Sequence, residues 1–412
     1  MVVASTCSST TFRGDESSFS PLTDKSDERV LEIATEIADR TASEAASVDC
    51  MGGFPVDGFA RLAASGFLSA PLQSEHGGIG LGFDSDRTAL LLKVLVQLGR
   101  GNLSLGRVFE GHVNALQLIQ TFGSSQQVAR FAADACAGKI FGVWNAEAAD
   151  GVKLHPLERG GYRLEGSKTF CSGCGYVERP FVNGVLPDGG WQMCIVPMEE
   201  VDISIDASWW QPLGMKASAS YKVNFTGVEL SEDELIGPPG QYFRQPWLSA
   251  GVVRFAAVQL GGAEALFDAT RRYLQDLRRT DHPYQQTRLG RMAIALEQGK
   301  LWLSGSADQV RSYAPMFGGL PNMARSEQAI ASEQLTAYAN MTRSTIEQVC
   351  MDMIQLSERS VGTLGLLPPY PMERIIRDLT LYLRQPAFDA ALADVGKYVL
   401  SAHADARELW DR

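Results

Sequence analysis

The hydrophobic pattern of this chain changes twice along its length, and this order constrains the fold more than any other feature. From about residue 25 to residue 138, apolar residues recur at helical spacing, behind Ser26 in the position of an N-cap. From residue 139 to about residue 240, short β-type runs are broken by glycine, proline and aspartate. Helical segments then return and are longer, and residues 322–360 contain neither glycine nor proline. A helix–strand–helix order excludes a Rossmann domain, in which strands and helices alternate.

Composition removes several functional classes. The 412 residues include 37 Lys and Arg against 48 Asp and Glu, and this acidic balance argues against general nucleic-acid binding. No stretch approaches the roughly 18–20 uninterrupted apolar residues of a membrane span. Residues 1–24 lack the basic start and apolar middle of a signal peptide and are predicted to be a flexible tail. Seven scattered cysteines favour reduced thiols, so we expect a cytoplasmic protein with no membrane or nucleic-acid partner.

Short motifs give little chemistry by themselves. The chain has neither the phosphate-binding GxxxxGK[ST] loop nor the GxSxG elbow of many serine hydrolases. Cys171-Ser-Gly-Cys174 ends a strand-type run and has no second pair of ligands, which favours unpaired thiols over a redox or zinc site. The five histidines lack the HxxxH and HExxH spacings, so we expect no metal site. His112 lies in a mostly apolar helical run, either as a core histidine or as a base that faces a pocket.

The strand-rich segment offers a place for a planar ligand. Trp144 and Asn145 end one β-type run, and residues 170–172 end another, each beside small residues. A flat aromatic cofactor needs an aromatic wall with hydroxyl or amide groups at its polar edge. Simple packing is the alternative interpretation of each of these residues.

Five segments together resemble the acyl-CoA dehydrogenase superfamily, from about residue 25 to the end of the chain. In order, they are SEHGGIGLG, GYRLEGSKTFCSG, LGMKASASYKVNFTGVEL, GAEALFDATRRY and VGTLGLLPPYPMERIIRD. The resemblance implies a mainly α, multi-domain α+β fold with a helical domain (25–138), a central β-barrel (139–240) and a C-terminal four-helix bundle (241–412). It also implies a flavin, FAD in most members, between barrel and bundle of a homodimer or homotetramer.

The resemblance also assigns residues to the cofactor. Phe170 would stand against the flavin ring, Ser172 would replace the threonine that hydrogen-bonds the flavin, and Asn145 would add a further contact. The remaining residues implied at the cofactor are Trp144, Cys171, Arg278, Arg279, Arg359, Gly362 and Thr363. The phosphate-binding segments around the arginines depart from the family pattern, so FMN is the alternative to FAD.

One departure concerns the catalytic base. Dehydrogenases of the family remove a proton from the substrate with a glutamate, and the corresponding position here is Pro386. The alternative position of that glutamate falls near residues 251–253, which contain no carboxylate. Proline and glycine cannot abstract a proton. Asp389 could replace the glutamate only if its loop were reshaped.

A second branch of the superfamily fits these departures better. The sequence has Asn145-Ala-Glu147 and Phe170-Cys-Ser-Gly173, which resemble segments of reduced-flavin monooxygenases of the dibenzothiophene monooxygenase type. Such enzymes take reduced flavin from a separate reductase and need polar groups in a dry pocket rather than a base. We would place Asn145, Ser172 and His112 in that pocket. The branch also uses a histidine near its final helix, where this chain has Leu-Arg384-Gln.

The sequence therefore predicts a flavin-dependent oxidoreductase, with a monooxygenase of a small or medium hydrophobic substrate favoured. The first alternative is an acyl-thioester dehydrogenase with a relocated base, and the second is a non-redox binding or partner subunit. Arg384 could bind a substrate carboxylate or the negative edge of the flavin, or form a salt bridge to Asp378 or Asp389. A flavin reductase or an electron-transfer protein is the expected partner, besides a small-molecule substrate.

Overall fold

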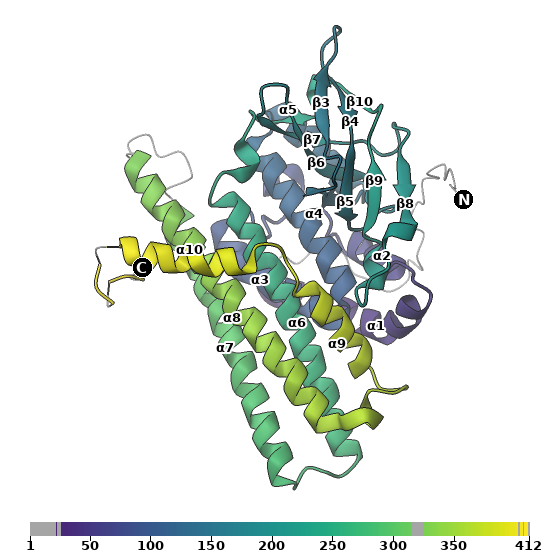
Figure 1. The fold of residues 1–412 in the computed structure, drawn as a ribbon, viewed down its shortest axis with the longest axis vertical. Helices are drawn as coiled ribbons and strands as arrows, with labels where there is room; N and C mark the ends of the chain where they lie inside the picture. Colours follow the sequence, from purple (N-terminus) through teal and green to yellow (C-terminus); the bar gives the residue numbers. More distant parts are fainter. Residues whose placement is uncertain (1–21, 23–25, 315–324, 403, 407, 411–412) are drawn as a thin grey trace. The chain divides into compact units, whose positions relative to one another are not determined.

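The structure is a computed structural model that describes residues 22, 26–314, 325–402, 404–406 and 408–410 (Figure 1). The predicted tail, residues 1–24, lies almost entirely outside the described residues. The chain forms two compact units. The strand unit contains residues 1–83, 104–212 and 216–244, and the bundle unit contains residues 84–103, 213–215 and 245–412.

Two of the helices of the strand unit begin at serine caps, which the sequence also indicates. The helices of this unit are α1 (Asp27–Cys50), α2 (Val56–Ala64), α4 (Leu103–Phe122) and α5 (Ser125–Cys136). Ser26 caps α1, because its side chain accepts a hydrogen bond from the Arg29 backbone N–H. Ser124 and Gln127 form a capping box at the start of α5. Apolar residues at helical spacing, such as Val30, Ile33 and Ile37, are buried, which confirms the predicted helical pattern.

The strands of this unit form two sheets. The larger sheet has the order β10-β4-β3-β6-β7-β11, and β1 also pairs with β6. The smaller sheet has the order β2-β5-β9-β8. The strands are β1 (Phe141–Val143), β2 (Ala146–Glu147), β3 (Lys153–Pro156), β4 (Tyr162–Glu165), β5 (Ser167–Cys171), β6 (Arg179–Val185), β7 (Trp191–Ile195), β8 (Ser204–Asp206), β9 (Tyr221–Asn224), β10 (Glu229–Leu230) and β11 (Leu235–Ile236). The predicted β-type runs are therefore strands.

Strand β6 is the centre of the larger sheet. It pairs in parallel with β1 and antiparallel with β7, and all but its last residue are buried. Because side chains alternate along a strand, Phe181 and Asn183 point to one face of β6. The helix α4 packs along β1, since the backbone N–H of Phe141 donates to the ring of His112 on α4.

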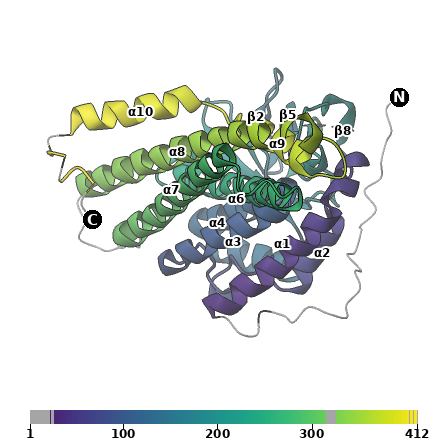
Figure 2. The ribbon, with the colours of Figure 1, turned by 90° about the horizontal axis from the view of Figure 1, so that it is seen from below.

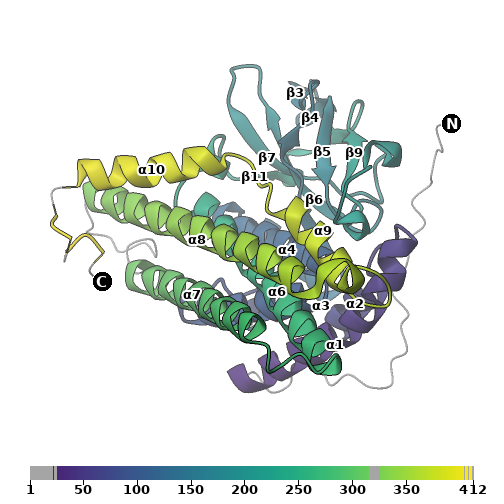
Figure 3. The same cartoon turned by 60° about the horizontal axis from the view of Figure 1, so that its bottom comes forward.

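The bundle unit consists of long helices that run side by side (Figures 2 and 3). They are α3 (Thr88–Gly101), α6 (Trp247–Asp276), α7 (Pro283–Tyr313), α8 (Arg325–Gly365), α9 (Met372–Tyr382) and α10 (Phe388–Ser401). The segment without glycine or proline forms most of α8, and the helical geometry breaks at Gly362, where φ is 60°.

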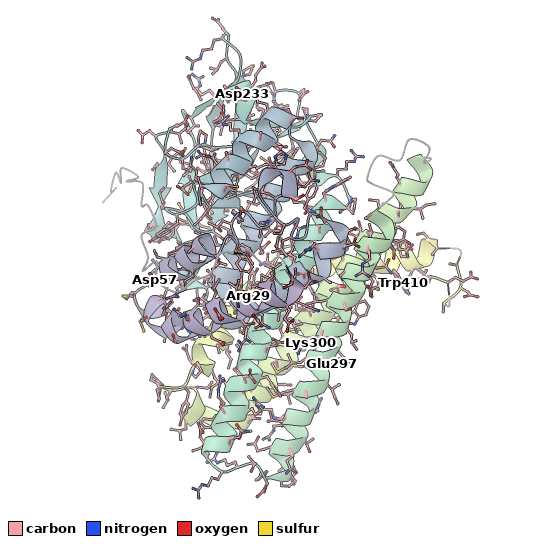
Figure 4. The ribbon with its side chains drawn as sticks, turned by 180° about the vertical axis from the view of Figure 1, so that it is seen from behind. Arg29, Asp57, Asp233, Glu297, Lys300 and Trp410 are labelled. Carbon is pink, nitrogen blue, oxygen red and sulfur yellow. The ribbon has the colours of Figure 1, made fainter. Side chains whose placement is uncertain are left out.

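Lys300 on α7, labelled in Figure 4, pairs with Glu264 of α6 at 3.0 Å. Trp410, also labelled, packs against Tyr398 of α10.

Two glycines let α3 and α6 approach closely. A Cβ atom on Gly99 would lie 2.2 Å from the Val258 carbonyl oxygen, and one on Gly261 would lie 2.1 Å from the Val96 carbonyl oxygen. Contacts thus join α3 to the bundle unit, although it precedes the strands in the sequence. The division into a helical domain, a barrel and a bundle at residues 138 and 240 stays a prediction.

One helix in the described part of the chain, α6, is long and apolar enough to cross a membrane by length and composition alone. Its apolar window is 61% buried inside the structure, as expected for the core helix of a bundle.

Candidate functional site

The end of β5 presents an aromatic residue to solvent. Phe170 is 52% exposed and has a φ of 51°, a left-handed conformation that costs a non-glycine residue about 1–2 kcal/mol. The hydrogen-bond register between β5 and β9 shifts at this point. The ring of Phe170 meets the ring of Trp209 edge-on, with centroids 4.9 Å apart, and lies 5.9 Å from that of Trp210. An exposed ring held in a strained conformation by two tryptophans is a candidate wall for a planar ligand.

A chain of hydroxyl groups lies directly after Phe170. The Ser172 hydroxyl is 2.8 Å from that of Ser220, which is 2.7 Å from that of Ser218. All three serines are buried. Ser172 therefore has a hydroxyl fixed in position, as the prediction of a flavin-contacting residue requires.

Trp144 lies directly after β1 and is buried. Its side chain is 1% exposed, and its Nε1–H donates a hydrogen bond of 2.9 Å to the Ser172 carbonyl oxygen. The indole therefore ties the end of β1 to the end of β5. Since so little of the ring is exposed, the geometry favours a packing role over a wall that a ligand would touch.

Asn145 follows Trp144 and is half-buried. Its Oδ1 accepts a hydrogen bond of 2.8 Å from the Asn183 backbone N–H. Its Nδ2 is buried and makes no close hydrogen bond to any residue that the structure describes. The Asn145 amide also lies near the Tyr242 hydroxyl and lowers its pKa, against the larger effect of burial, which raises it. A buried donor without a well-formed partner is what a site for a polar ligand would show.

Cys171 and Cys174 are buried. Burial, and then the neighbouring Cys174, raise the pKa of Cys171 well above its usual range. A thiol of this kind is a poor nucleophile and a poor metal ligand, because both roles need the thiolate. Cys171 lies on β5 beside Phe170, but the structure shows no exposed sulfur there for a ligand to touch.

His112 lies inside the core of the strand unit rather than in a pocket. Its Nε2 is 2.7 Å from the Leu68 carbonyl oxygen, and its Nδ1 accepts a hydrogen bond of 3.0 Å from the Phe141 N–H. The ring is fully buried, and burial lowers its pKa to about 4. With both ring nitrogen atoms engaged by backbone groups, the imidazole has no free position for a substrate. The geometry therefore favours a structural role over the predicted catalytic role.

The predicted phosphate-binding residues gather at one end of the bundle unit. Arg278 and Arg279 are exposed in the turn after α6, and Arg359, Gly362 and Thr363 are exposed near the end of α8. These helix ends meet, since the Tyr273 hydroxyl of α6 donates to the Val361 carbonyl of α8 at 3.2 Å. The structure thus brings these five residues, which are distant in sequence, to the same end of the bundle.

Arg384 forms an ion pair that the sequence did not predict. Its Nη2 lies 3.1 Å from Oε1 of Glu347 on α8, whereas Asp378 accepts a hydrogen bond of 2.6 Å from the Met215 N–H. The Arg384 side chain is 57% exposed and that of Glu347 is 6% exposed. Burial raises the pKa of Glu347, and Asp389, which is exposed in the first turn of α10, raises it further. Arg384 can therefore still offer N–H groups to an anion.

The loop that contains Pro386 is held by a second arginine. Arg343 of α8 donates to the Gln385 and Pro386 carbonyl oxygens at 3.1 and 2.7 Å. Its guanidinium lies 5.4 Å from the ring centroid of Phe255 and 5.7 Å from that of Phe388. This packing fixes the segment that precedes Asp389.

Several residues at these places escaped the sequence analysis. Trp209 and Trp210 form a conspicuous aromatic pair in the sequence, and they could have been noticed. The hydroxyls of Ser218 and Ser220 look ordinary until β9 pairs with β5. Glu347 had no local signal, because its burial depends on the packing of α8 against later helices.

Comparisons with known proteins agree with this architecture. Two family models match the chain, the acyl-CoA dehydrogenase N-terminal domain over residues 24–139 and the acyl-CoA dehydrogenase C-terminal domain over residues 253–384. A dibenzothiophene monooxygenase of Rhodococcus erythropolis is 25% identical over 407 residues, which cover 92% of this chain and 94% of that protein. A short-chain specific acyl-CoA dehydrogenase of Clostridium acetobutylicum is 24% identical, over 85% of this chain and 91% of that protein.

A solved structure shows the same fold. The complex of TdsC from Paenibacillus sp. A11-2 with FMN and indole superimposes with a TM-score of 0.81 at 22% identity, over 93% of this chain and all of that chain. The matched family models lie on both sides of the strands, and the similarity to relatives and to this fold extends along the chain. The chain therefore belongs to the acyl-CoA dehydrogenase superfamily.

Proposed function

We propose that the protein is a reduced-flavin-dependent monooxygenase that acts on a small or medium hydrophobic substrate. The observation that carries this proposal is the group at the strand ends, where exposed Phe170, the Ser172 hydroxyl and the buried Nδ2 of Asn145 all belong to the strand unit. The similarity to a dibenzothiophene monooxygenase supports the same chemistry.

The residues present fit a flavin. A ring system needs an aromatic neighbour and hydrogen-bond donors at its polar edge, and Phe170, Ser172 and Asn145 offer these groups. A bound reduced flavin supplies the two electrons that activate dioxygen. The chain's own groups would orient the ring, exclude water and donate hydrogen bonds from the Asn145 amide.

FAD and FMN differ in the number of their phosphate groups. FAD carries two phosphates and FMN carries one, and the arginines at the end of the bundle, Arg278, Arg279 and Arg359, are the expected partners for either. We infer FMN as the first choice and FAD as the alternative, since the solved TdsC complex contains FMN. Gly362 and Thr363 lie at the same helix end and would contribute backbone and hydroxyl contacts.

One observation favours the dehydrogenase alternative. Glu347 is a buried carboxylate with a raised pKa, held by Arg384 on the bundle unit. A carboxylate of this kind is a suitable general base. Glu347 replaces Asp389 as the first residue to test in that role, because Asp389 is exposed.

The proposal includes partners and an assembly. A separate flavin reductase would supply the reduced cofactor to a cytoplasmic enzyme. A homodimer or homotetramer is supported by the outer face of α7, where Ile294 and Leu301, one heptad apart, are 63% and 62% exposed.

An anaerobic titration separates the two activities. In the first assay, flavin-loaded protein is mixed with a panel of acyl-CoAs, and the flavin absorbance is followed. In the second assay, the protein receives a flavin reductase, NADH, oxygen and either dibenzothiophene or indole, and the products are analysed. We expect no bleaching by acyl-CoAs and an oxygenated product in the coupled reaction. Bleaching that is lost in Glu347→Gln, with no oxygenated product, would reverse the assignment.

A further inference from the structure

A buried asparagine lies beside the Asn145 position with its hydrogen-bonding capacity unused. Asn183 on β6 is 1% exposed, and both its Oδ1 and its Nδ2 are buried without a hydrogen-bond partner among the described residues. Its backbone N–H donates a hydrogen bond of 2.8 Å to Oδ1 of Asn145. Buried polar groups in native proteins are almost always satisfied, so an unfilled amide indicates that a ligand or water is bound there in solution.

Tyr242 lies on the same face of β6. Its ring centroid is 6.0 Å from that of Phe181, and Phe181 and Asn183 point to one side of the strand. The hydroxyl of Tyr242 lies near the Asn145 amide. Burial keeps the phenol protonated at neutral pH, and it can therefore act as a hydrogen-bond donor.

A charged group on α4 is close to this tyrosine. Arg107 and Glu110 form an ion pair, and the Asn114 Nδ2 donates to Glu110 at 2.6 Å. Glu110 is 2% exposed, whereas the Arg107 side chain is 23% exposed. Electrostatic interactions with both charges reach the Tyr242 hydroxyl. The Glu110 carboxylate is thus paired with the Arg107 guanidinium and with the Asn114 amide.

We propose that Tyr242 and Asn183 complete, with Asn145, a hydrogen-bonding pocket for an oxygen atom that carries negative charge during the reaction. Tyr242 is then a further catalytic residue, and Asn183 contributes to binding the same atom. Donors that converge in a buried place stabilise developing negative charge, because they need no reorganisation when the charge appears. This inference rests on the proposed function, in which dioxygen is reduced at the flavin.

The test uses Tyr242→Phe and Asn183→Leu in the full-length protein, with Tyr162→Phe on β4 as the matched control. Three quantities are measured: the thermal midpoint of the flavin-free protein, the FMN affinity by fluorescence quenching, and the share of NADH that ends as hydrogen peroxide in the reductase-coupled reaction with indole. The first measurement needs no loaded enzyme.

We expect the thermal midpoint to stay within about 1 °C of the wild-type value or to rise, because an unpaired polar group is lost. The FMN affinity should change less than about threefold, while the peroxide share rises about fivefold, as expected for one lost hydrogen bond. The control should change none of these quantities.

Three other outcomes overturn the inference. If both variants lower the thermal midpoint by several degrees and leave the peroxide share unchanged, the groups are structural. If the stability and the peroxide share both equal those of the wild type, the pocket takes no part in the reaction. If the wild-type protein itself forms no oxygenated product, the proposed function fails, and the inference falls with it.

Discussion

The strongest test of how the structure assigns roles concerns His112, which the sequence left open between core and catalysis. Replacing His112 with leucine removes both hydrogen bonds of the ring and leaves the Leu68 carbonyl and the Phe141 N–H buried. Each unpaired backbone group costs about 1–2 kcal/mol, so we expect a loss of about 2–4 kcal/mol in the free energy of unfolding. Urea unfolding, followed by tryptophan fluorescence, measures this loss.

The pH dependence adds a second, independent magnitude. The folded pKa of His112 is about 4, below the value of about 6.5 expected in the unfolded chain. Because the folded pKa is depressed, the unfolded state binds a proton first as pH falls below about 6.5, and stability is lost from there down to the folded pKa. Between pH 8 and pH 5 the histidine should remove about 2 kcal/mol of stability from the wild-type protein.

His112→Leu has no side chain that titrates at this position. Between pH 8 and pH 5, its free energy of unfolding should therefore fall by about 2 kcal/mol less than that of the wild type. His282→Leu, which replaces an exposed histidine, is the control and should behave like the wild type. If His112→Leu unfolds like the wild type at every pH but loses flavin-dependent activity, the structural assignment is wrong. A wild-type protein as stable at pH 5 as at pH 8 would refute the reasoning about burial.

Three further predictions follow from the same structure. Arg179→Met should destabilise the fold by about 2–3 kcal/mol in urea unfolding, since it leaves carboxylates without their buried partner. Burial raises the pKa of Glu199, but hydrogen bonds from Arg179, from the backbone and from Lys139 lower it to about 2. These interactions stabilise the wild type above about pH 4.5 and less as the pH falls toward 2, and Arg179→Met should lose the part that Arg179 contributes, as measured by acid unfolding. Phe170→Gly should relieve the left-handed backbone strain and leave the thermal midpoint unchanged or higher. The same change should weaken FMN binding about tenfold in a fluorescence titration, and an unchanged affinity would remove Phe170 from the site. Gly261→Ala should lower the free energy of unfolding by more than about 3 kcal/mol, because the new Cβ would lie 2.1 Å from the Val96 carbonyl oxygen. A thermal midpoint equal to that of the wild type would show that α3 and α6 can separate.

Much of the fold could be predicted because its signals are local. Ser26 begins α1, the run without glycine or proline became most of α8, and the short apolar runs became strands. These features depend on residues a few positions apart, where helix caps, turn residues and the alternation of side chains act. The place of α3 in the bundle unit could not be predicted in this way, because it depends on close contacts at Gly99 of α3 and Gly261 of α6, which are more than 150 residues apart in the chain.

The candidate site was predicted less well, because the role of a side chain depends on distant partners. Phe170 is exposed, and its contact with a flavin stays a prediction, whereas Trp144 is buried and donates a hydrogen bond to the Ser172 carbonyl. Sequence alone could not show that His112 meets Leu68, which lies 44 residues earlier, or that Arg384 meets Glu347 rather than a nearby aspartate. Residue type limits the chemistry of each group, while pairing across the fold decides whether that chemistry is available.

The polar groups themselves discriminate between the two redox activities. Abstraction of an α-proton needs one carboxylate at one place, and the two positions where the family would supply it hold proline and a glycine–valine run. Stabilisation of charged oxygen needs only donors, and the strand unit has the hydroxyl of Tyr242 and the buried amide nitrogens of Asn145 and Asn183. These two nitrogens have no hydrogen-bond partner among the described residues. Keeping buried donors unpaired is unfavourable, since each costs about 1–3 kcal/mol. A fold that retains them while it lacks a carboxylate at the usual positions is therefore better suited to oxygen chemistry than to dehydrogenation.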